Sequence, residues 1–169
     1  MSPLLPEKPH VHEVVHEKYS YQLDPDLSDN KRFAELKAYW DGKRGARPMP
    51  RRADIDPIEL RDHLGSLVMI DVLPGAVDFR MRLIGTAIVS FYGRDSTGRL
   101  LSELKVADPE WWRFCDELYR AVAQQARIAR ARGTLRMVGK DYRRFEALLL
   151  PLDAGNGHVG MIMAEQLIS

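Results

Sequence analysis

The histidines cluster near the N-terminus. His10, His12 and His16 lie close together and are interleaved with two glutamates. On a helix His12 and His16 would share one face, an arrangement that suits zinc or nickel. However, Pro9 interrupts this segment, and no helical periodicity supports it. We interpret the segment as a solvated tail and predict neither a metal site nor a cofactor.

Catalytic chemistry would need a nucleophile or a carboxylate in a pocket. Cys115 could pair with His63 or His158, but it lies on the apolar stripe of an expected helix, where a cysteine acts as a small hydrophobe. Asp71 or Glu165 could serve a small cone-shaped α+β isomerase or hydratase if either carboxylate faced inward. Each could equally be an edge or outer-face charge. We predict no catalytic residue and keep the isomerase as the alternative.

Two basic segments could bind anions. Residues Gly93–Arg99 combine glycines, arginines and hydroxyls that could cradle a phosphate, but the Lys-Ser/Thr ending of a P-loop is missing. Further along lies a locally basic region made of Arg127, Arg130, Arg132, Arg136, Lys140, Arg143 and Arg144. No recognition helix or aromatic ladder accompanies it. We interpret both segments as surface structure and predict no nucleic-acid partner.

The composition is that of an ordinary globular domain. The chain has 169 residues, 45% of them hydrophobic, and a formal net charge of +1 from 25 basic and 24 acidic residues. Its single cysteine cannot form an internal disulfide, which favours a reducing compartment. It has no apolar run of about 18 residues. These features predict a single domain in the cytoplasm, without a membrane partner.

The elements that position these residues follow from periodicity and punctuation. Prolines break up residues 1–27, which we expect to form a flexible arm, with at most an extended edge at 19–23. Apolar spacing and caps predict helices over 28–49, 56–65, 86–92, 100–104 and 108–132. Alternation and turns predict strands over 67–73, 78–84, 134–139, 144–152 and 158–168. Both faces of the first strand are apolar, so it should be covered on both sides. This order predicts an α+β domain with an antiparallel sheet.

This order resembles the PAS domain, a sensory module with a five-stranded antiparallel sheet and helices on one face. More specifically, the chain resembles a group of stand-alone bacterial PAS proteins. The similar stretches are Pro50-Arg51-Arg52-Ala53-Asp54-Ile55-Asp56-Pro57, Leu83-Ile84-Gly85-Thr86, Gly93-Arg94-Asp95, Thr97-Gly98-Arg99 and Leu148-Leu149-Leu150-Pro151-Leu152. The resemblance covers about Phe33 to Ile168 and implies a non-enzymatic sensing or interaction role. We expect the PAS-like domain itself over residues 50–169, preceded by an extra N-terminal helix.

The cofactor-binding branches of that family leave marks that are missing here. Flavin photoreceptors carry an Asn-Cys-Arg-Phe core, whereas Cys115 follows Arg113-Phe114. Haem-binding members need a histidine on the long helix, and residues 108–132 contain none. An unknown small ligand could still lie between sheet and helices, because such pockets are mostly apolar. The candidate lining residues are Ile70, Phe79, Met81, Leu83, Phe91, Trp112 and Tyr119, and a filled core explains them equally well.

The N-terminal amphipathic helix predicts an interface. It could cover the outer sheet face of its own subunit or exchange with a partner, and apolar faces left over normally mark an interface. We predict a homodimer with Phe33, Leu36, Tyr39 and Trp40 as anchors. With no kinase, cyclase or DNA-binding segment in the sequence, we expect a signal to leave through a partner protein or a change of assembly.

Overall fold

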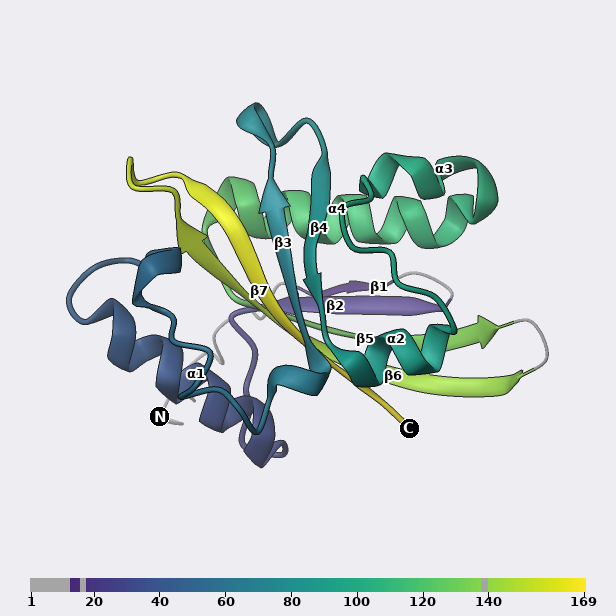
Figure 1. The fold of residues 1–169 in the computed structure, drawn as a ribbon, viewed down its shortest axis with the longest axis horizontal. Helices are drawn as coiled ribbons and strands as arrows, with labels where there is room; N and C mark the ends of the chain where they lie inside the picture. Colours follow the sequence, from purple (N-terminus) through teal and green to yellow (C-terminus); the bar gives the residue numbers. More distant parts are fainter. Residues whose placement is uncertain (1–12, 16–17, 138–139) are drawn as a thin grey trace, which may run out of the picture.

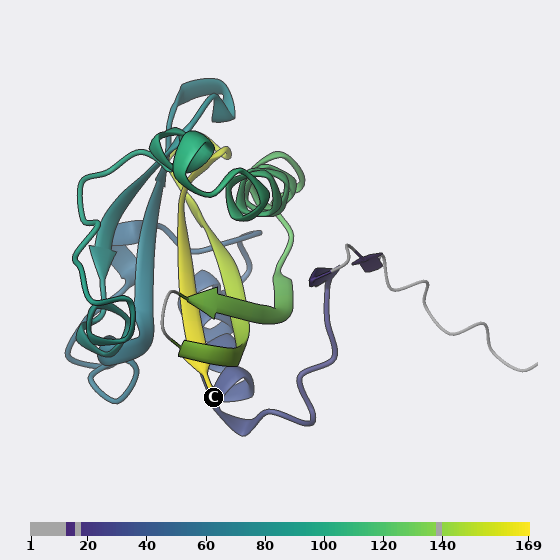
Figure 2. The ribbon, with the colours of Figure 1, turned by 90° about the vertical axis from the view of Figure 1, so that its right-hand side faces the viewer.

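The computed structural model describes residues 13–15, 18–137 and 140–169, with side chains from 136 to 142 left out. One antiparallel sheet runs through the molecule in the order β1-β2-β5-β6-β7-β3-β4. Its strands are β1 (Glu13–Val15), β2 (Tyr19–Leu23), β3 (Leu67–Val72), β4 (Phe79–Ile84), β5 (Ala129–Met137), β6 (Lys140–Asp153) and β7 (Val159–Ile168). Figure 2 shows the order by colour, from teal β4 and β3 through yellow β7 to green β6 and β5 and then purple β2.

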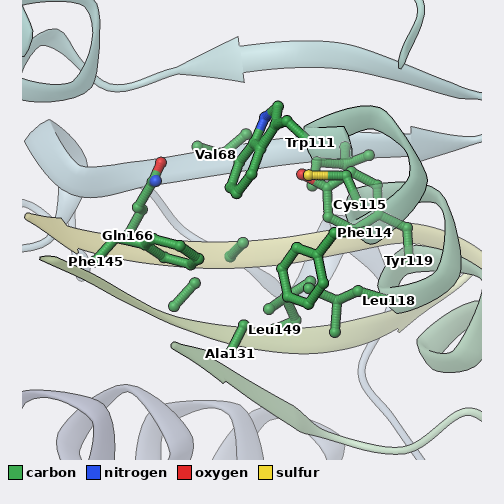
Figure 3. Close-up of a pocket in the computed structure, with 13 residues that line it drawn as sticks. Val68, Trp111, Phe114, Cys115, Leu118, Tyr119, Ala131, Phe145, Leu149 and Gln166 are labelled. Carbon is green, nitrogen blue, oxygen red and sulfur yellow. The ribbon is translucent and has the colours of Figure 1, made fainter. Parts of the chain in front are cut away.

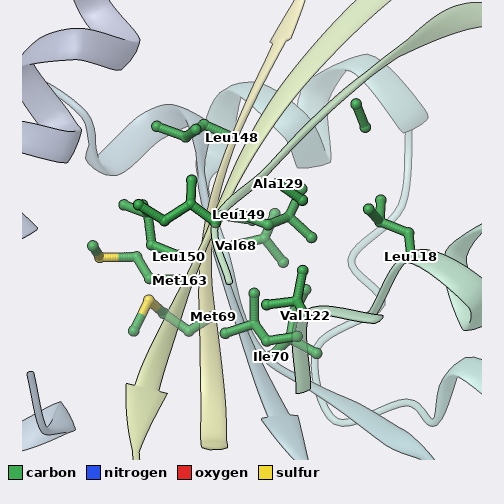
Figure 4. Packing of buried hydrophobic residues seen from close by; sticks show 14 of the residues in the cluster. Val68, Met69, Ile70, Leu118, Val122, Ala129, Leu148, Leu149, Leu150 and Met163 are labelled. Atoms are coloured by element: carbon green, nitrogen blue, oxygen red, sulfur yellow. The ribbon is translucent and has the colours of Figure 1, made fainter. Parts of the chain in front are cut away.

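Helices cover both faces of this sheet. They are α1 (Lys31–Arg44), α2 (Thr86–Tyr92), α3 (Leu104–Ala107) and α4 (Pro109–Gln125). Figure 1 shows α1 at the opposite end of the view from α2 and the β5–β6 hairpin. Figure 4 shows Met69 and Met163 on the side of the sheet that α1 covers, and Ile70 and Val122 on the side of α4. We call these the α1 face and the α4 face.

The first predicted strand is covered on both sides, as expected. In β3, Leu67 and Met69 alternate with Val68 and Ile70, and all are buried. The strand lies between β4 and β7.

Local signals set the ends of the two longest helices. The Asn30 side chain accepts a hydrogen bond from the Phe33 amide at 3.1 Å, which caps α1. Asp108 caps α4 in the same way, accepting from the Trp111 amide at 3.1 Å. Proline at the first position of α4 needs no amide partner. The sequence offers cap residues for both helices. The structure confirms the predicted Asp108 cap of α4.

Within the described residues, the sheet has seven strands rather than the expected five. The five predicted strands are present as β3 to β7, and the two additional ones come from the segment expected to be an arm. Tyr19, Tyr21 and Leu23 alternate with more exposed neighbours, so β2 buries one face. Its pairing with β5 covers a sheet edge that would otherwise leave backbone groups unpaired.

The long helix is shorter than predicted. It ends at Gln125, with Ala126 at φ +52°, and β5 begins at Ala129 instead of continuing a helix to residue 132. Ala and Arg favour helices locally, but tertiary pairing decides this segment. Arg130 bonds partners on the α1 face, whereas Ala131 lines a cavity on the α4 face.

The helix predicted over residues 56–65 is also wrong. The segment forms turns that lead into a short 3-10 helix at Leu64–Ser66. Asp56 accepts from the Ile58 amide two residues on, which closes an Asx turn instead of capping a helix.

Candidate functional site

A small cavity lies between the sheet and α4. Its volume is about 40 Å³. Figure 3 shows Gln166 and Phe145 toward one end of it and Cys115, Tyr119 and Leu118 toward the other. The lining residues are Val68, Ile70, Trp111, Phe114, Cys115, Leu118, Tyr119, Ala131, Phe145, Ala147, Leu149, Ala164 and Gln166.

The cavity exists because small residues of the sheet lie below large rings. Ala131 of β5 pairs in register with Ala147 of β6, and Ala164 lies on the neighbouring strand β7. These three alanines form the floor of the cavity. Above it, Trp111 and Phe145 contact each other edge to face, with ring centroids 5.4 Å apart. The three methyl groups fill less of the space beneath these rings than longer side chains would, and the cavity lies there.

The groups that can form hydrogen bonds in the cavity are uncharged. Among the described residues that line it, none carries a formal charge. Gln166 donates from Nε2 to the Tyr92 hydroxyl of α2 at 3.1 Å. Burial raises the pKa of Tyr92 to about 12. Burial also raises the pKa of the Cys115 thiol, to well above its ordinary value. Phenol and thiol therefore stay protonated, so the cavity favours uncharged molecules.

The cavity is smaller than a typical ligand. A volume of about 40 Å³ has room for one water. By comparison, an engineered apolar cavity that binds benzene measures about 150 Å³. A ring-sized molecule could enter only if part of the wall moved.

The comparison with protein families agrees with this architecture. Residues 29–164 match the PAS domain family, from just before α1 into β7. The chain belongs to the PAS domain family. No curated protein matches it. The match supports the family resemblance, whereas similarity to the stand-alone bacterial group remains a prediction.

The sequence motif behind that finer resemblance has a structural role in this PAS domain. Asp54 accepts from the Arg51 amide at 2.8 Å and from the Arg47 guanidinium at the same distance. These bonds fold the connection between α1 and β3. They lower the pKa of the Asp54 carboxyl, the Arg51 amide being the largest cause.

Two of the predicted ligand residues line the cavity of the PAS domain. They are Ile70 and Tyr119. Phe79 lies just behind, with its ring 5.4 Å from that of Tyr119. Met81 and Phe91 are partly buried against the core but do not line the cavity.

The other two predicted residues point elsewhere. Leu83 pairs with Met69 and is 41% exposed, because a register shift in the β3–β4 ladder places it on the α1 face. Strict alternation along β4 was therefore the wrong expectation. Trp112 lies under the Lys105 ammonium, which is 4.9 Å from its ring centroid. The adjacent Trp111 lines the cavity instead, and the helical stripe through Cys115 could have indicated this.

The carboxylates of the isomerase alternative do not reach the cavity. Glu165 is fully buried on the α1 face, where it accepts from Arg32 Nε at 2.9 Å and Ser66 Oγ at 2.7 Å. His63 Nδ1 lies 3.0 Å from the same carboxylate, so His63 does not pair with Cys115. Asp71 lies 3.9 Å from Arg82 and does not line the cavity. The arrangement gives the isomerase alternative no support.

The predicted interface residues lie inside the chain's own core. Phe33 and Leu36 are 0% exposed, and Trp40 donates from Nε1 to the Pro151 carbonyl at 2.9 Å. Tyr39 is partly exposed, and its hydroxyl accepts from the Asp56 amide. A dimer through the three buried side chains would require α1 to exchange between copies. The homodimer stays a prediction.

Three residues of the basic region, Arg127, Arg130 and Arg132, are paired with acidic groups. Arg130 is 3% exposed and forms hydrogen bonds with Asp29 and Glu146, and Arg132 reaches the same two carboxylates. Arg127 pairs with Asp24. This pairing leaves less positive charge for a nucleic-acid backbone than the sequence suggested.

Metal and membrane features have few observations to support them. His10, His12 and His16 lie outside the described residues. Within the part of the chain that is described, no three His, Cys, Asp or Glu side chains are placed to hold a metal ion. In that same part, no helix is long and apolar enough to span a membrane.

Proposed function

We propose that this PAS domain is a non-enzymatic sensory module that binds a small neutral molecule in the α4-face cavity. The supporting observation is the cavity itself, an apolar space above Ala131, Ala147 and Ala164 whose lining side chains are uncharged. Pockets for small molecules are mostly apolar with a few placed polar groups. Gln166 supplies such a group.

Gln166 is the proposed hydrogen-bonding anchor for the ligand. Binding would first change the hydrogen bonds of this side chain. Its amide already donates one Nε2 hydrogen to the Tyr92 hydroxyl, so a ligand that accepts this same hydrogen competes with α2. A ligand can bias a conformational equilibrium only through such differential contacts. The signal would then pass to a partner protein or to a second copy of the chain.

Indole, a neutral aromatic molecule, is a suitable probe for this proposal. We expect indole to shift the Gln166 side-chain amide signals in NMR spectra of the wild-type protein. Ala147→Leu fills the cavity and should weaken indole binding at least tenfold. Ala38→Leu is the matched control, because Ala38 is exposed on α1 and should leave binding unchanged. Equal binding by all three proteins would refute the cavity as the site.

The dimer needs a separate measurement. Native mass spectrometry of the purified protein reports both the assembly and any co-purified small molecule. A dimer that releases one defined neutral compound supports the sensory function, and a strict monomer contradicts the proposed homodimer.

A further inference from the structure

The end wall of the cavity is supported from outside by the N-terminal strand. We call residues 18–23, which comprise Lys18 and strand β2, the strap. Tyr19 of the strap packs on three rings that line the cavity: Trp111 at 5.3 Å, Phe114 at 4.8 Å and Phe145 at 6.2 Å between centroids. Tyr19 itself does not line the cavity. It therefore holds those rings in place from behind.

A glycine in β5 provides the seat for this ring. Gly133 pairs with Tyr19 on one side and with Phe145 on the other. A Cβ atom at Gly133 would lie 2.7 Å from the Lys18 carbonyl oxygen and equally close to both rings. Glycine within a strand often marks such a close approach. The strap can dock at this edge only because residue 133 has no side chain.

A second contact joins the strap to the helix that carries Trp111. Lys18 Nζ lies 2.9 Å from Glu110 Oε2, in the first turn of α4. Both side chains are about half exposed, at 41% and 50%. Such an exposed pair adds little stability, but it links the strap to the residue next to Trp111.

Among the strands around the cavity, the strap has the shortest neighbour on its outer side. The floor strands β6 and β7 each lie between two strands of at least six residues, and α4 buries Phe114, Cys115, Leu118 and Val122. The strap lies near the sheet edge, with the three-residue strand β1 beyond it. Local opening is drawn from segments with few stabilising contacts. The strap also precedes residues 29–164, so it lies outside the family match.

We propose that the strap is a latch for the cavity, and that a ring-sized neutral ligand and the docked strap exclude each other. This inference rests on the proposed function, because it assumes that the cavity is the binding site. Binding moves Trp111 and Phe145 outward. The Tyr19 ring, which packs on both, then loses its position, and the strap undocks. The coupling is reciprocal. A partner that binds the undocked strap strengthens ligand binding by the same factor by which the ligand strengthens the binding of that partner. The strap is then the segment that a partner protein could detect.

Hydrogen exchange with indole as the probe tests the latch. In the full-length protein, saturating indole should raise amide exchange of Tyr19–Leu23 at least tenfold and leave α1 unchanged. Gly133→Ala should raise this exchange without indole and should bind indole at least threefold more tightly. Gly42→Ala is the control, because a Cβ at Gly42 meets no atom within 4 Å.

A second variant guards against misfolding of Gly133→Ala. Tyr19→Ala removes the ring but adds no atom to the strand, and it should also tighten indole binding. If indole binds while exchange of Tyr19–Leu23 stays constant or falls, the latch is refuted and the binding site stands. Unchanged affinity in both variants also refutes the latch. If indole binds neither the wild type nor Tyr19→Ala, the proposed function is refuted together with it.

Discussion

The buried carboxylate of Glu165 predicts an asymmetry between two variants. Glu165 is 0% exposed and is met by Arg32, His63 and Ser66. The Arg32 side chain, by contrast, is 39% exposed. Arg32→Ala therefore leaves a buried anion without its guanidinium, whereas Glu165→Gln leaves a cation that can turn toward water.

The expected magnitudes follow from these exposures. Removing one partner so that the other charge stays buried costs about 3–5 kcal/mol of unfolding free energy, which applies to Arg32→Ala. Glu165→Gln loses charge-assisted hydrogen bonds without burying a charge, at about 1.5–3 kcal/mol. The double variant Arg32→Met, Glu165→Leu replaces the pair with apolar groups and should lie closer to wild type than Arg32→Ala.

Urea unfolding followed by far-UV circular dichroism and tryptophan fluorescence measures these differences. Arg32→Ala should unfold at a lower urea concentration than Glu165→Gln. If the order is reversed, or if both variants match the wild type, Glu165 is not held by Arg32 and α1 is not fixed to the sheet by this pair. The double variant controls for loss of side-chain volume.

Four further variants test other parts of the fold by urea unfolding. Gly85→Ala should unfold at a much lower urea concentration, because its Cβ would fall on backbone atoms of the 3-10 helix at Leu64–Ser66. Gly42→Ala, by contrast, should gain about 0.5–1 kcal/mol of unfolding free energy from helix propensity. Trp40→Phe loses the bond to Pro151 and should cost at least about 1 kcal/mol; no loss would contradict that bond. The hydrogen bond with Arg130 lowers the pKa of Asp29, so its contribution is present above the ordinary Asp pKa and is lost as pH falls through the lowered folded value. Asp29→Asn should flatten this acid-side loss between about pH 5 and pH 2; an unchanged pH profile would contradict it.

The sequence was most informative where local and global preferences agree. Alternating apolar residues in β3 and the capped start of α4 predicted elements that the structure contains. Those signals depend on residues a few positions apart, so a single chain carries them in full. The order of the five central strands and the helices between them was enough to indicate the PAS fold, which the family match supports.

The sequence was misleading where distant partners decide. Residues 126–132 favour a helix locally, yet pairing with β2 and β6 makes most of them a strand. One register shift in the β3–β4 ladder moved Leu83 to the other face. The choice of Trp112 over Trp111 had no such cause, since the helical stripe already pointed to Trp111.

By itself, therefore, the sequence determined the kind of domain and much of its apolar interior. Only the tertiary structure decided where that interior is left open. The cavity depends on three alanines of different strands meeting under two rings, and the strap depends on Gly133 lying between Tyr19 and Phe145. Such coincidences arise from strand pairing across long sequence separations, and a short stretch of sequence does not say which distant residue lies beside each of its positions.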